Sequence, residues 1–156
     1  MVPDRYLDSM SVPVHERMWR HHLREDRKLG DGSPGPWTVT LVADASGAGV
    51  VGFLEGGPER EGVPGYEAEL NALYLIAPWQ RHGLGGRLVH AFVRELPARG
   101  ASSMLVWALA ANPARAFYRR MGGVEISHEP DLIGATVLEK VAYGWTDLSI
   151  SFPPTG

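Results

Sequence analysis

Apolar and polar positions along the chain predict an α/β fold whose second half alternates strands with helices. The segments with the alternation or apolar content of strands are 37–42, 49–54, 68–76, 103–109, 123–127 and 135–145. One helix is predicted from Leu84, Leu88, Phe92 and Leu96, spaced four apart, and another after Asn112-Pro113, an N-cap residue followed by proline. A strand–helix–strand–helix–strand order requires at least one parallel pair of strands. We therefore predict a single α/β domain with a central mixed β-sheet flanked by helices.

Three further segments complete this outline. Residues 1–29 have apolar positions at helical spacing and a polar end, so we expect a helical N-terminal segment there. The turn residues at 44–47 predict a hairpin of the first two strands. Residues 128–134 are polar and predict a loop between the last two strands.

The strand at 68–76 is predicted to have one apolar face and one polar face, because side chains alternate along a strand. Members of the first face would be Ala68, Leu70, Ala72, Tyr74 and Ile76. The second would hold Glu67, Glu69 and Asn71 and continue into Leu73 and Leu75. Two carboxylates two residues apart can point into one cleft, so each is a candidate general base. The alternative is a solvated strand face.

The segment Gln80-Arg-His-Gly83-Leu-Gly85-Gly86 lies between this strand and the long helix. Such a turn leaves backbone N–H groups unpaired at the positive end of the helix, and glycine allows a phosphate to come close. A P-loop is excluded because no Gly-Lys-Ser/Thr follows, and the dinucleotide fingerprint is excluded because the glycine spacing differs. The turn alone predicts either a phosphate site or a simple helix start.

Together with a second motif, this turn resembles the GCN5-related N-acetyltransferase (GNAT) family. The first motif is Gln-x-x-Gly-x-Gly after a strand, and the second is Asn112-Pro-Ala-Arg-Ala-Phe-Tyr118-Arg-Arg-Met-Gly122 after the next strand. Both stand in the family's order at roughly its spacing, and residues 141–148 are similar to the end of many small members. The resemblance covers residues 37–148 and implies one GNAT-like acetyltransferase domain over residues 1–156.

The resemblance also implies where acetyl-CoA would bind as co-substrate. Its pyrophosphate would be held by backbone N–H groups of the turn residues Gln80, Arg81, His82, Gly83, Leu84, Gly85 and Gly86. Leu75 and Ile76 would offer backbone groups to the pantetheine arm and polarise the thioester carbonyl, and Asn112 would contact pantetheine. Tyr118 matches the general acid for the leaving thiolate. Glu69 lies where histone-acetylating members place a general-base glutamate.

Acetyl transfer to an amine explains why a base is needed. An alkyl ammonium with a pKa near 10.4 is neutral in only about one molecule in 2,500 at pH 7, so a carboxylate must accept its proton. Glu69 is the first candidate and Glu67 the second. Tyr118 has a structural alternative as a core tyrosine with a satisfied hydroxyl, and Phe117 and Trp79 are interpreted as packing residues.

The sequence departs from the family's pattern at its N-terminus. Members usually open with a strand and a helix ahead of a segment similar to residues 2–8, which here stands at the N-terminus. We therefore expect that first strand and helix to be lacking, through a start codon assigned too late or because another subunit supplies the cover. A homodimer is expected, because the sheet edge at 37–42 would otherwise leave backbone groups unpaired.

Composition excludes several other classes of protein. Cysteine is absent, which excludes a disulfide scaffold, a thiol nucleophile and cysteine-ligated metal. The net charge of −3 has the wrong sign for binding nucleic acid through phosphates. No apolar segment approaches a membrane span, and the charged N-terminus is unlike a signal peptide. We therefore expect a cytoplasmic protein. His15 and the adjacent His21-His22 complete no metal site, so we expect no metal.

These observations predict an N-acetyltransferase that moves an acetyl group from acetyl-CoA to a primary amine by direct transfer in a ternary complex. The acceptor is expected to be a cationic small molecule or, second, a peptide N-terminus, because many carboxylates lie in or beside the predicted cleft loops. Two alternatives are a non-catalytic acyl-CoA-binding module of the same fold and a phosphate-ligand domain of another fold.

Overall fold

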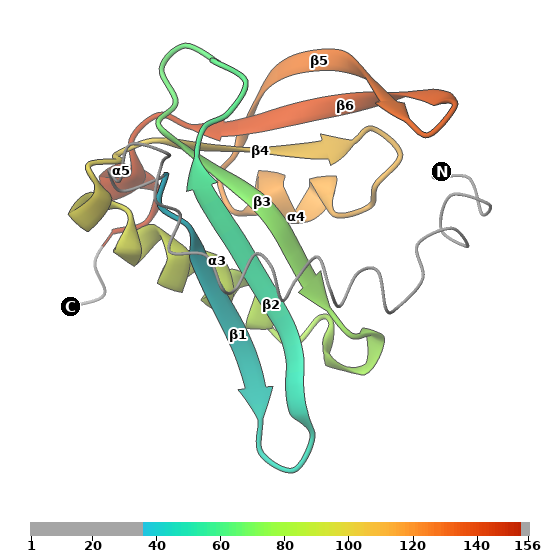
Figure 1. Ribbon diagram of the computed structural model, residues 1–156. Coiled ribbons are helices and arrows are strands. Elements are labelled where there is room, and N and C mark those ends of the chain that lie inside the picture. Colours follow the sequence, from blue (N-terminus) through green and yellow to red (C-terminus); the bar gives the residue numbers. More distant parts are fainter. Residues whose placement is uncertain (1–35, 154–156) are drawn as a thin grey trace, which may run out of the picture.

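A computed structural model describes residues 36–153 and confirms the α/β class, with a six-stranded mixed sheet flanked by helices (Figure 1). The strands are β1 (Val39–Ala45), β2 (Gly49–Pro58), β3 (Ala68–Leu75), β4 (Met104–Leu109), β5 (Val124–Ile133) and β6 (Thr136–Trp145). The helices are η1 (Ala77–Trp79), α3 (Leu84–Glu95), η2 (Pro97–Arg99), α4 (Arg115–Arg120) and α5 (Leu148–Ser151). The predicted helical segment 1–29, and the expectation about the elements ahead of it, lie outside the described residues.

The strand order of the sheet is β1-β2-β3-β4-β6-β5, and only β3 and β4 are parallel neighbours. Pairing between these two is short, with Ala68–Leu70 opposite Met104–Val106. Beyond it β3 continues to Leu75 and β4 to Leu109, and the two strands diverge in the direction of their C-terminal ends (Figure 1). The sheet is therefore split at its centre, between two strands whose backbone edges face a gap.

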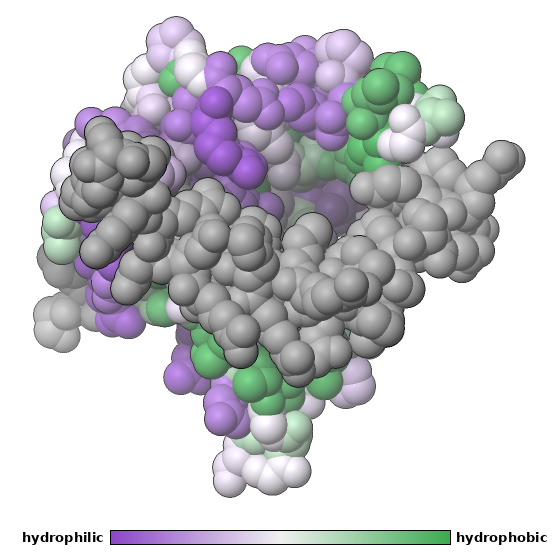
Figure 2. Space-filling model, in the orientation of Figure 1, coloured by the Kyte–Doolittle hydropathy of each residue, from purple (hydrophilic) through white to green (hydrophobic). Residues whose placement is uncertain are grey.

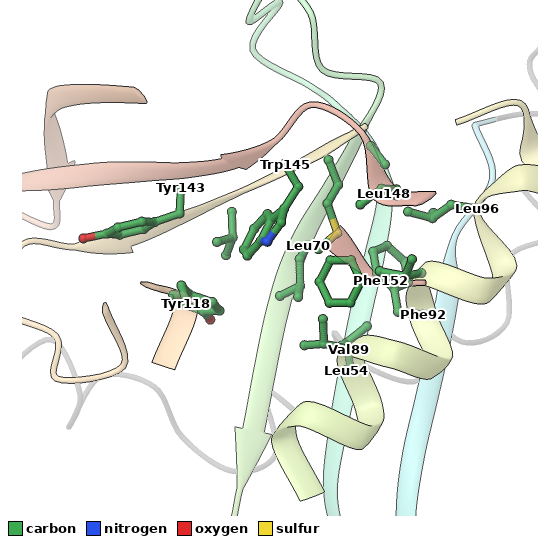
Figure 3. Packing of buried hydrophobic residues seen from close by; sticks show 14 of the residues in the cluster. Leu54, Leu70, Val89, Phe92, Leu96, Tyr118, Tyr143, Trp145, Leu148 and Phe152 are labelled. Carbon is green, nitrogen blue, oxygen red and sulfur yellow. The ribbon is translucent and has the colours of Figure 1, made fainter. Parts of the chain in front are cut away.

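Helix α3 covers one face of the sheet against β1, β2 and β3. Its buried side chains are Leu88, Val89, Phe92 and Val93, so Leu88 and Phe92 face the core as predicted, whereas Leu84 is only half-buried. Figure 3 shows Val89 and Phe92 close to residues from β2, β3, β6 and α5, which include Leu54, Leu70, Trp145, Leu148 and Phe152. None of the helices within residues 36–153 combines the length and apolar character needed to cross a bilayer.

Strand β3 contains a β-bulge that the sequence did not predict. Gly56 of β2 pairs with Leu70, but the preceding residue, Glu55, pairs with Ala72. Asn71 is therefore an extra residue on β3, opposite no residue of β2. A bulge bends its strand and changes which face each later side chain takes.

The bulge reverses the faces of β3 over its second half. Leu73 and Leu75 pack against the core on the same side as Leu70. Tyr74 and Ile76 are 64% and 52% exposed, although the alternation predicted them on the apolar face with Leu70. The predicted alternation is therefore wrong beyond the bulge, because one inserted residue shifts a two-residue period by one position.

The predicted loop at 128–134 is also wrong, because most of it belongs to β5. This strand runs to Ile133 and pairs with β6 across a two-residue turn at 134–135, where Gly134 takes a φ of 63°. Glu129 lies opposite Lys140 in this hairpin. Polar cross-strand pairs stabilise the segment, and they carry no apolar alternation that a sequence pattern would reveal.

Candidate active site

The turn between β3 and α3 exposes consecutive backbone N–H groups. Helix α3 begins at Leu84, and its first N–H to reach a carbonyl is that of Arg87, 3.1 Å from the oxygen of Gly83. Within the described part of the chain the N–H groups of residues 81–86 have no hydrogen-bond partner. Arg81 and Gly83 both have left-handed backbones, with φ of 65° and 80°. Such turns at a helix start form concave anion-binding sites.

Glycine at the start of α3 is not required by the protein's own packing. A Cβ on Gly83 would meet nothing within 4 Å. One on Gly85 would lie 3.5 Å from the Phe117 ring, and one on Gly86 would lie 3.8 Å from Met121 Sδ, both ordinary contact distances. The backbone at these positions is therefore open to approach from outside, and at Gly83 the left-handed φ of 80° favours glycine as well.

The Gln80 side chain links the turn to the end of β3 by a hydrogen bond. Its Nε2 donates a hydrogen bond to the Leu75 carbonyl at 2.9 Å. Arg81 and His82, the next two residues, are exposed, and Arg81 adds a positive charge at the turn. The predicted turn residues therefore form one continuous turn, and the Gln80 side chain stabilises its conformation.

The end of β3 presents backbone groups to the gap beside β4. The N–H of Ile76 donates to the Val51 carbonyl at 3.0 Å, so this group is used within the sheet. Because successive strand residues point their backbone groups to opposite edges, those of Leu73 and Leu75 point away from β2 and toward β4. The pairing with β4 ends at Leu70, which leaves these edge groups without a strand partner. The backbone of Leu73, which was not among the predicted site residues, points the same way as that of Leu75, while the N–H of the predicted Ile76 is used within the sheet. The binding role of Leu75 and Ile76 stays a prediction.

Asn112 caps the first turn that leads into α4. Its Oδ1 accepts from the Ala114 N–H at 2.9 Å, while α4 itself begins at Arg115, slightly later than the Asn-Pro signal predicts. The Asn112 side-chain nitrogen has no hydrogen-bond partner among residues 36–153. The side chain is exposed, so this nitrogen is free to donate to a ligand.

Tyr118 combines a buried ring with an available hydroxyl. The residue is 7% exposed, its ring packs edge-on against Phe117 and it stacks on Tyr143 with centroids 6.1 Å apart (Figure 3). Its hydroxyl has no partner in the described part of the chain and is not among the fully buried polar atoms. Burial raises the pKa of Tyr118 to about 12, with a smaller rise from Tyr74. The phenol therefore stays protonated at neutral pH and is suited to donating a proton.

Both carboxylates predicted as base candidates already have partners. Glu69 is 3% exposed, and its two oxygens accept from Arg60 Nη2 at 2.8 Å and Nε at 3.2 Å. Glu67 accepts from the Ser102 N–H at 2.7 Å and the Ser102 hydroxyl at 3.0 Å, and these bonds lower the pKa of Glu67. The two side chains therefore bind different loops, and each oxygen of Glu69 already accepts one guanidinium N–H.

Other acidic side chains gather on the face of the sheet opposite α3. Figure 2 shows strongly hydrophilic residues over its upper part, where the β2–β3 loop and strands β5 and β6 lie. Lys140 of β6 donates to both oxygens of Glu61 at 2.7 and 2.8 Å and lies 4.0 Å from Glu129. Glu59 instead accepts backbone N–H groups of residues 61–63 and shapes the loop.

A second charged network joins α4 to the outer hairpin. His128 bonds to Glu139 through Nδ1 and to Glu125 through Nε2, and the same Glu125 accepts from Arg119 at 2.9 Å. Hydrogen bonds to Glu139 and then Glu125 raise the pKa of His128. The bonds to Arg119 and His128 lower the pKa of Glu125 to about 2.

Stability should therefore fall as pH rises through the neutral range. His128 contributes stability that is fully present below its unfolded pKa of about 6.5 and is lost as pH passes its raised folded pKa. Thermal unfolding of the wild type and His128→Gln from pH 5 to 9 tests this. The difference in Tm should be largest at pH 5–6 and shrink toward pH 9, and a constant difference would contradict the assignment.

Comparison with protein-family models shows which family the chain belongs to. The model of the "Acetyltransferase (GNAT) family" matches residues 4–123, which span the turn, the split between β3 and β4, and Tyr118. The chain belongs to the GNAT family. This confirms the expected enzyme class, an acetyl-CoA-dependent N-acetyltransferase.

Relatives of this GNAT chain agree with the family and the fold. It is 32% identical over 149 residues to the uncharacterized N-acetyltransferase YuaI of Bacillus subtilis (strain 168), covering 96% of this chain and 79% of that protein. An N-acetyltransferase from Staphylococcus aureus Mu50 is similar in structure, with a TM-score of 0.64, 17% identity and coverage of 89% and 78% of the two chains. YncA from Salmonella typhimurium, solved with its cofactor acetyl-CoA, has a TM-score of 0.57 at 22% identity and covers 69% of this chain and 64% of that one.

Sequence reasoning missed three polar residues of the GNAT chain that lie close to the point where β3 and β4 separate. Glu55, Asn71 and Trp107 each place a buried polar atom on the sheet, and none of them belongs to a family motif quoted above. Within residues 36–153 no group of three or more His, Asp or Glu side chains is placed to hold a metal ion.

Proposed function

We propose that this GNAT protein transfers the acetyl group of acetyl-CoA to a primary amine, directly, within a ternary complex. The observation that carries the proposal is the row of N–H groups at residues 81–86, which have no hydrogen-bond partner among the described residues, next to the part of β3 that extends beyond its pairing with β4. No cysteine is present to form an acyl-enzyme, which favours direct transfer. YncA supports the choice of co-substrate, since that protein was solved with acetyl-CoA.

The turn and the strand edge would bind the two halves of acetyl-CoA. The N–H groups of residues 81–86 suit a pyrophosphate. Arg81 adds a local positive charge, which attracts the phosphates although the net charge of the protein is −3. The backbone of Leu73 and Leu75 suits the amide groups of the pantetheine arm and polarisation of the thioester carbonyl. Asn112 would donate its free side-chain nitrogen to the same arm.

Tyr118 would protonate the departing sulfur. Its ring is fixed by Phe117 and Tyr143, and its hydroxyl is free of partners among the described residues. With a pKa of about 12 it keeps its proton at neutral pH, and its transfer to the departing sulfur is completed when the proton lost by the acylated nitrogen restores the hydroxyl. The role of Glu69 as general base stays a prediction. It requires Glu69 to accept a proton while it is paired with Arg60.

The acceptor is proposed to be a cationic small-molecule amine, with a peptide N-terminus as the second candidate. Four carboxylates, those of Glu55, Glu61, Glu69 and Glu129, surround Arg60 and Lys140 on the open face. Four negative charges against two positive ones favour a positively charged ligand.

A second candidate function is a non-catalytic acyl-CoA-binding module. It is favoured by the engagement of both predicted base carboxylates, Glu69 by Arg60 and Glu67 by Ser102. Such a module would bind acetyl-CoA without turning it over.

Thiol release from acetyl-CoA, measured with a panel of primary amines, tests the proposal. We expect release that depends on enzyme and amine and an acetylated amine detected by mass spectrometry. Omitting the amine measures hydrolysis, which is the control. Stabilisation by CoA with no thiol release from any amine would instead establish the binding module.

A further inference from the structure

Three buried side-chain atoms that normally form hydrogen bonds have no partner among the described residues. They are Glu55 Oε2, Asn71 Oδ1 and Trp107 Nε1. An unsatisfied buried polar atom costs about 1–3 kcal/mol, so three of them on one surface require an explanation. Two are acceptors and one is a donor, which is the complement of a ligand with N–H donors and an oxygen.

All three residues lie on the face of the sheet opposite α3. Leu54, the chain neighbour of Glu55, packs in the core under α3, so Glu55 takes the other face. Asn71 lies on that face too, because its Nδ2 would be 3.9 Å from a Cβ on Gly57, whereas a Cβ on Gly56 would meet Phe92 of α3. Val106 and Ala108 are likewise in that core, which places Trp107 with them. The three residues therefore form a row across β2, β3 and β4.

The row crosses the sheet at the level where β3 and β4 separate. The last paired residues are Leu70 and Val106, and Asn71 and Trp107 are the next residue on each strand. Glu55 lies opposite Ala72, next to the bulge. These polar atoms therefore lie beside the gap whose other borders are the free edge of β3 and the helix that carries Tyr118.

The two ends of the row lie near different charged groups. At the β4 end Lys140 Nζ, which is paired with Glu61, lies 4.1 Å from the centre of the Trp107 ring. At the β2 end Glu55 acts on Arg60, but the hydrogen bonds of that guanidinium go to Glu69. Glu55 thus keeps an oxygen that no cation occupies in the described residues.

We propose that this row is the amine site, in which Glu55 and Asn71 bind the ammonium group and Glu55, rather than Glu69, accepts its proton. This inference rests on the proposed transfer reaction and extends it to the substrate class. The Trp107 N–H, beside Lys140, takes an oxygen of the same molecule. The acceptor is therefore an alkyl amine that also carries a hydroxyl or carbonyl oxygen.

The reaction balances with these groups. The ammonium gives one proton to Glu55, and the neutral nitrogen then attacks the thioester carbonyl carbon, forming the C–N bond. The C–S bond breaks, and sulfur takes the proton of Tyr118. The second proton lost by nitrogen restores the Tyr118 hydroxyl, and Glu55 releases its proton to water.

Glu55→Gln tests the assignment, since glutamine keeps the shape and removes the base. With 3-aminopropanol as acceptor we expect kcat/KM at pH 7 to fall by about 100-fold or more, and part of this loss to be recovered toward pH 10, where the amine is neutral without a base. The charged groups around Glu55 are Arg60, on which Glu55, Glu61 and Glu69 all act, and Lys140, which pairs with Glu61. Glu69→Gln should show no such recovery at high pH, and Glu95→Gln, a surface carboxylate paired with Arg99, should match the wild type.

A binding measurement makes the inference independent of turnover. The indole N–H signal of Trp107 in a proton–nitrogen NMR spectrum of the CoA-loaded protein, assigned with Trp107→Phe, should move on adding 3-aminopropanol. It should move much less in Glu55→Gln, and less in the wild type with 1-propanol, which lacks the amine.

The outcomes separate the two proposals. Thiol release that is absent with every amine contradicts the transfer function, whatever the Trp107 signal does. An unmoved Trp107 signal in the wild type, or equal movement in Glu55→Gln, overturns the amine site. So does a Glu55→Gln enzyme with wild-type kcat/KM at pH 7 while Glu69→Gln loses activity there and recovers it toward pH 10.

Discussion

Gly83→Val should abolish the stabilisation that CoA gives this protein. A ligand at a hundredfold excess over its Kd stabilises by about 2.7 kcal/mol, which for a chain of this size raises Tm by about 5–10 °C. A valine side chain at residue 83 would stand in the open space before the unpaired N–H groups of 81–86. Differential scanning fluorimetry with and without CoA should show the full shift in the wild type and little or none in the variant.

Gly100→Val is the matched control for this experiment. Gly100 has a φ of 76° against 80° for Gly83, and a Cβ at either position meets nothing within 4 Å. Both variants therefore suffer the same strain of a left-handed backbone, and both should lower the Tm of the free protein to a similar extent. Only Gly83→Val should lose the CoA shift. Equal CoA shifts in the two variants would place the pyrophosphate elsewhere.

Gly85→Ala probes the same turn without backbone strain. Its Cβ would lie at an ordinary 3.5 Å from Phe117, and alanine favours a helix over glycine by about 0.5–1 kcal/mol. The free protein should be as stable as the wild type or more so, while the CoA shift decreases. The opposite result, lower stability with a full shift, would show that Gly85 serves packing alone.

The sequence predicts those parts of the fold in which periodicity is unbroken. Leu88 and Phe92 lie in the core as their spacing indicates, and the glycines of residues 83–86 mark the start of α3. The bulge at Asn71 escapes prediction, because an inserted residue has no signature of its own and its effect depends on pairing with β2. The second half of β5 escapes for a similar reason, since cross-strand polar pairs depend on register.

The same distinction holds for the site. Backbone sites such as the glycine turn are visible in sequence because only certain residues permit them. Side-chain roles are not, because they depend on partners distant in the chain: Glu69 meets Arg60, and Glu67 meets Ser102. Glu55 differs from them in having a buried oxygen without a hydrogen-bond partner among the described residues. The sequence alone therefore does not predict this unpaired oxygen, because it depends on how the neighbouring strands pack around Glu55.

Tyr118→Phe should lower kcat without lowering stability. The ring contacts with Phe117 and Tyr143 remain, and the hydroxyl makes no hydrogen bond within the described residues whose loss would destabilise the fold. A thiolate leaves fairly well on its own, with the cysteine pKa near 8.5 as a guide. We therefore expect kcat to fall by about 10- to 100-fold, at the lower end of general acid effects, with KM for acetyl-CoA nearly unchanged.

Tyr143→Phe supplies the converse control in the ring stacked on Tyr118. Its hydroxyl accepts from Arg115 at 2.8 Å and donates to Glu125 at 3.1 Å, so its removal breaks two bonds to charged groups and should cost about 1–3 kcal/mol of stability. Because this hydroxyl is committed to that network, kcat should stay near the wild-type value. Single-turnover kinetics and thermal unfolding of both variants then give opposite patterns: a slow, stable Tyr118→Phe and a fast, less stable Tyr143→Phe. If the chemical step in Tyr118→Phe is as fast as in the wild type, Tyr118 is a packing residue and sulfur takes its proton from water.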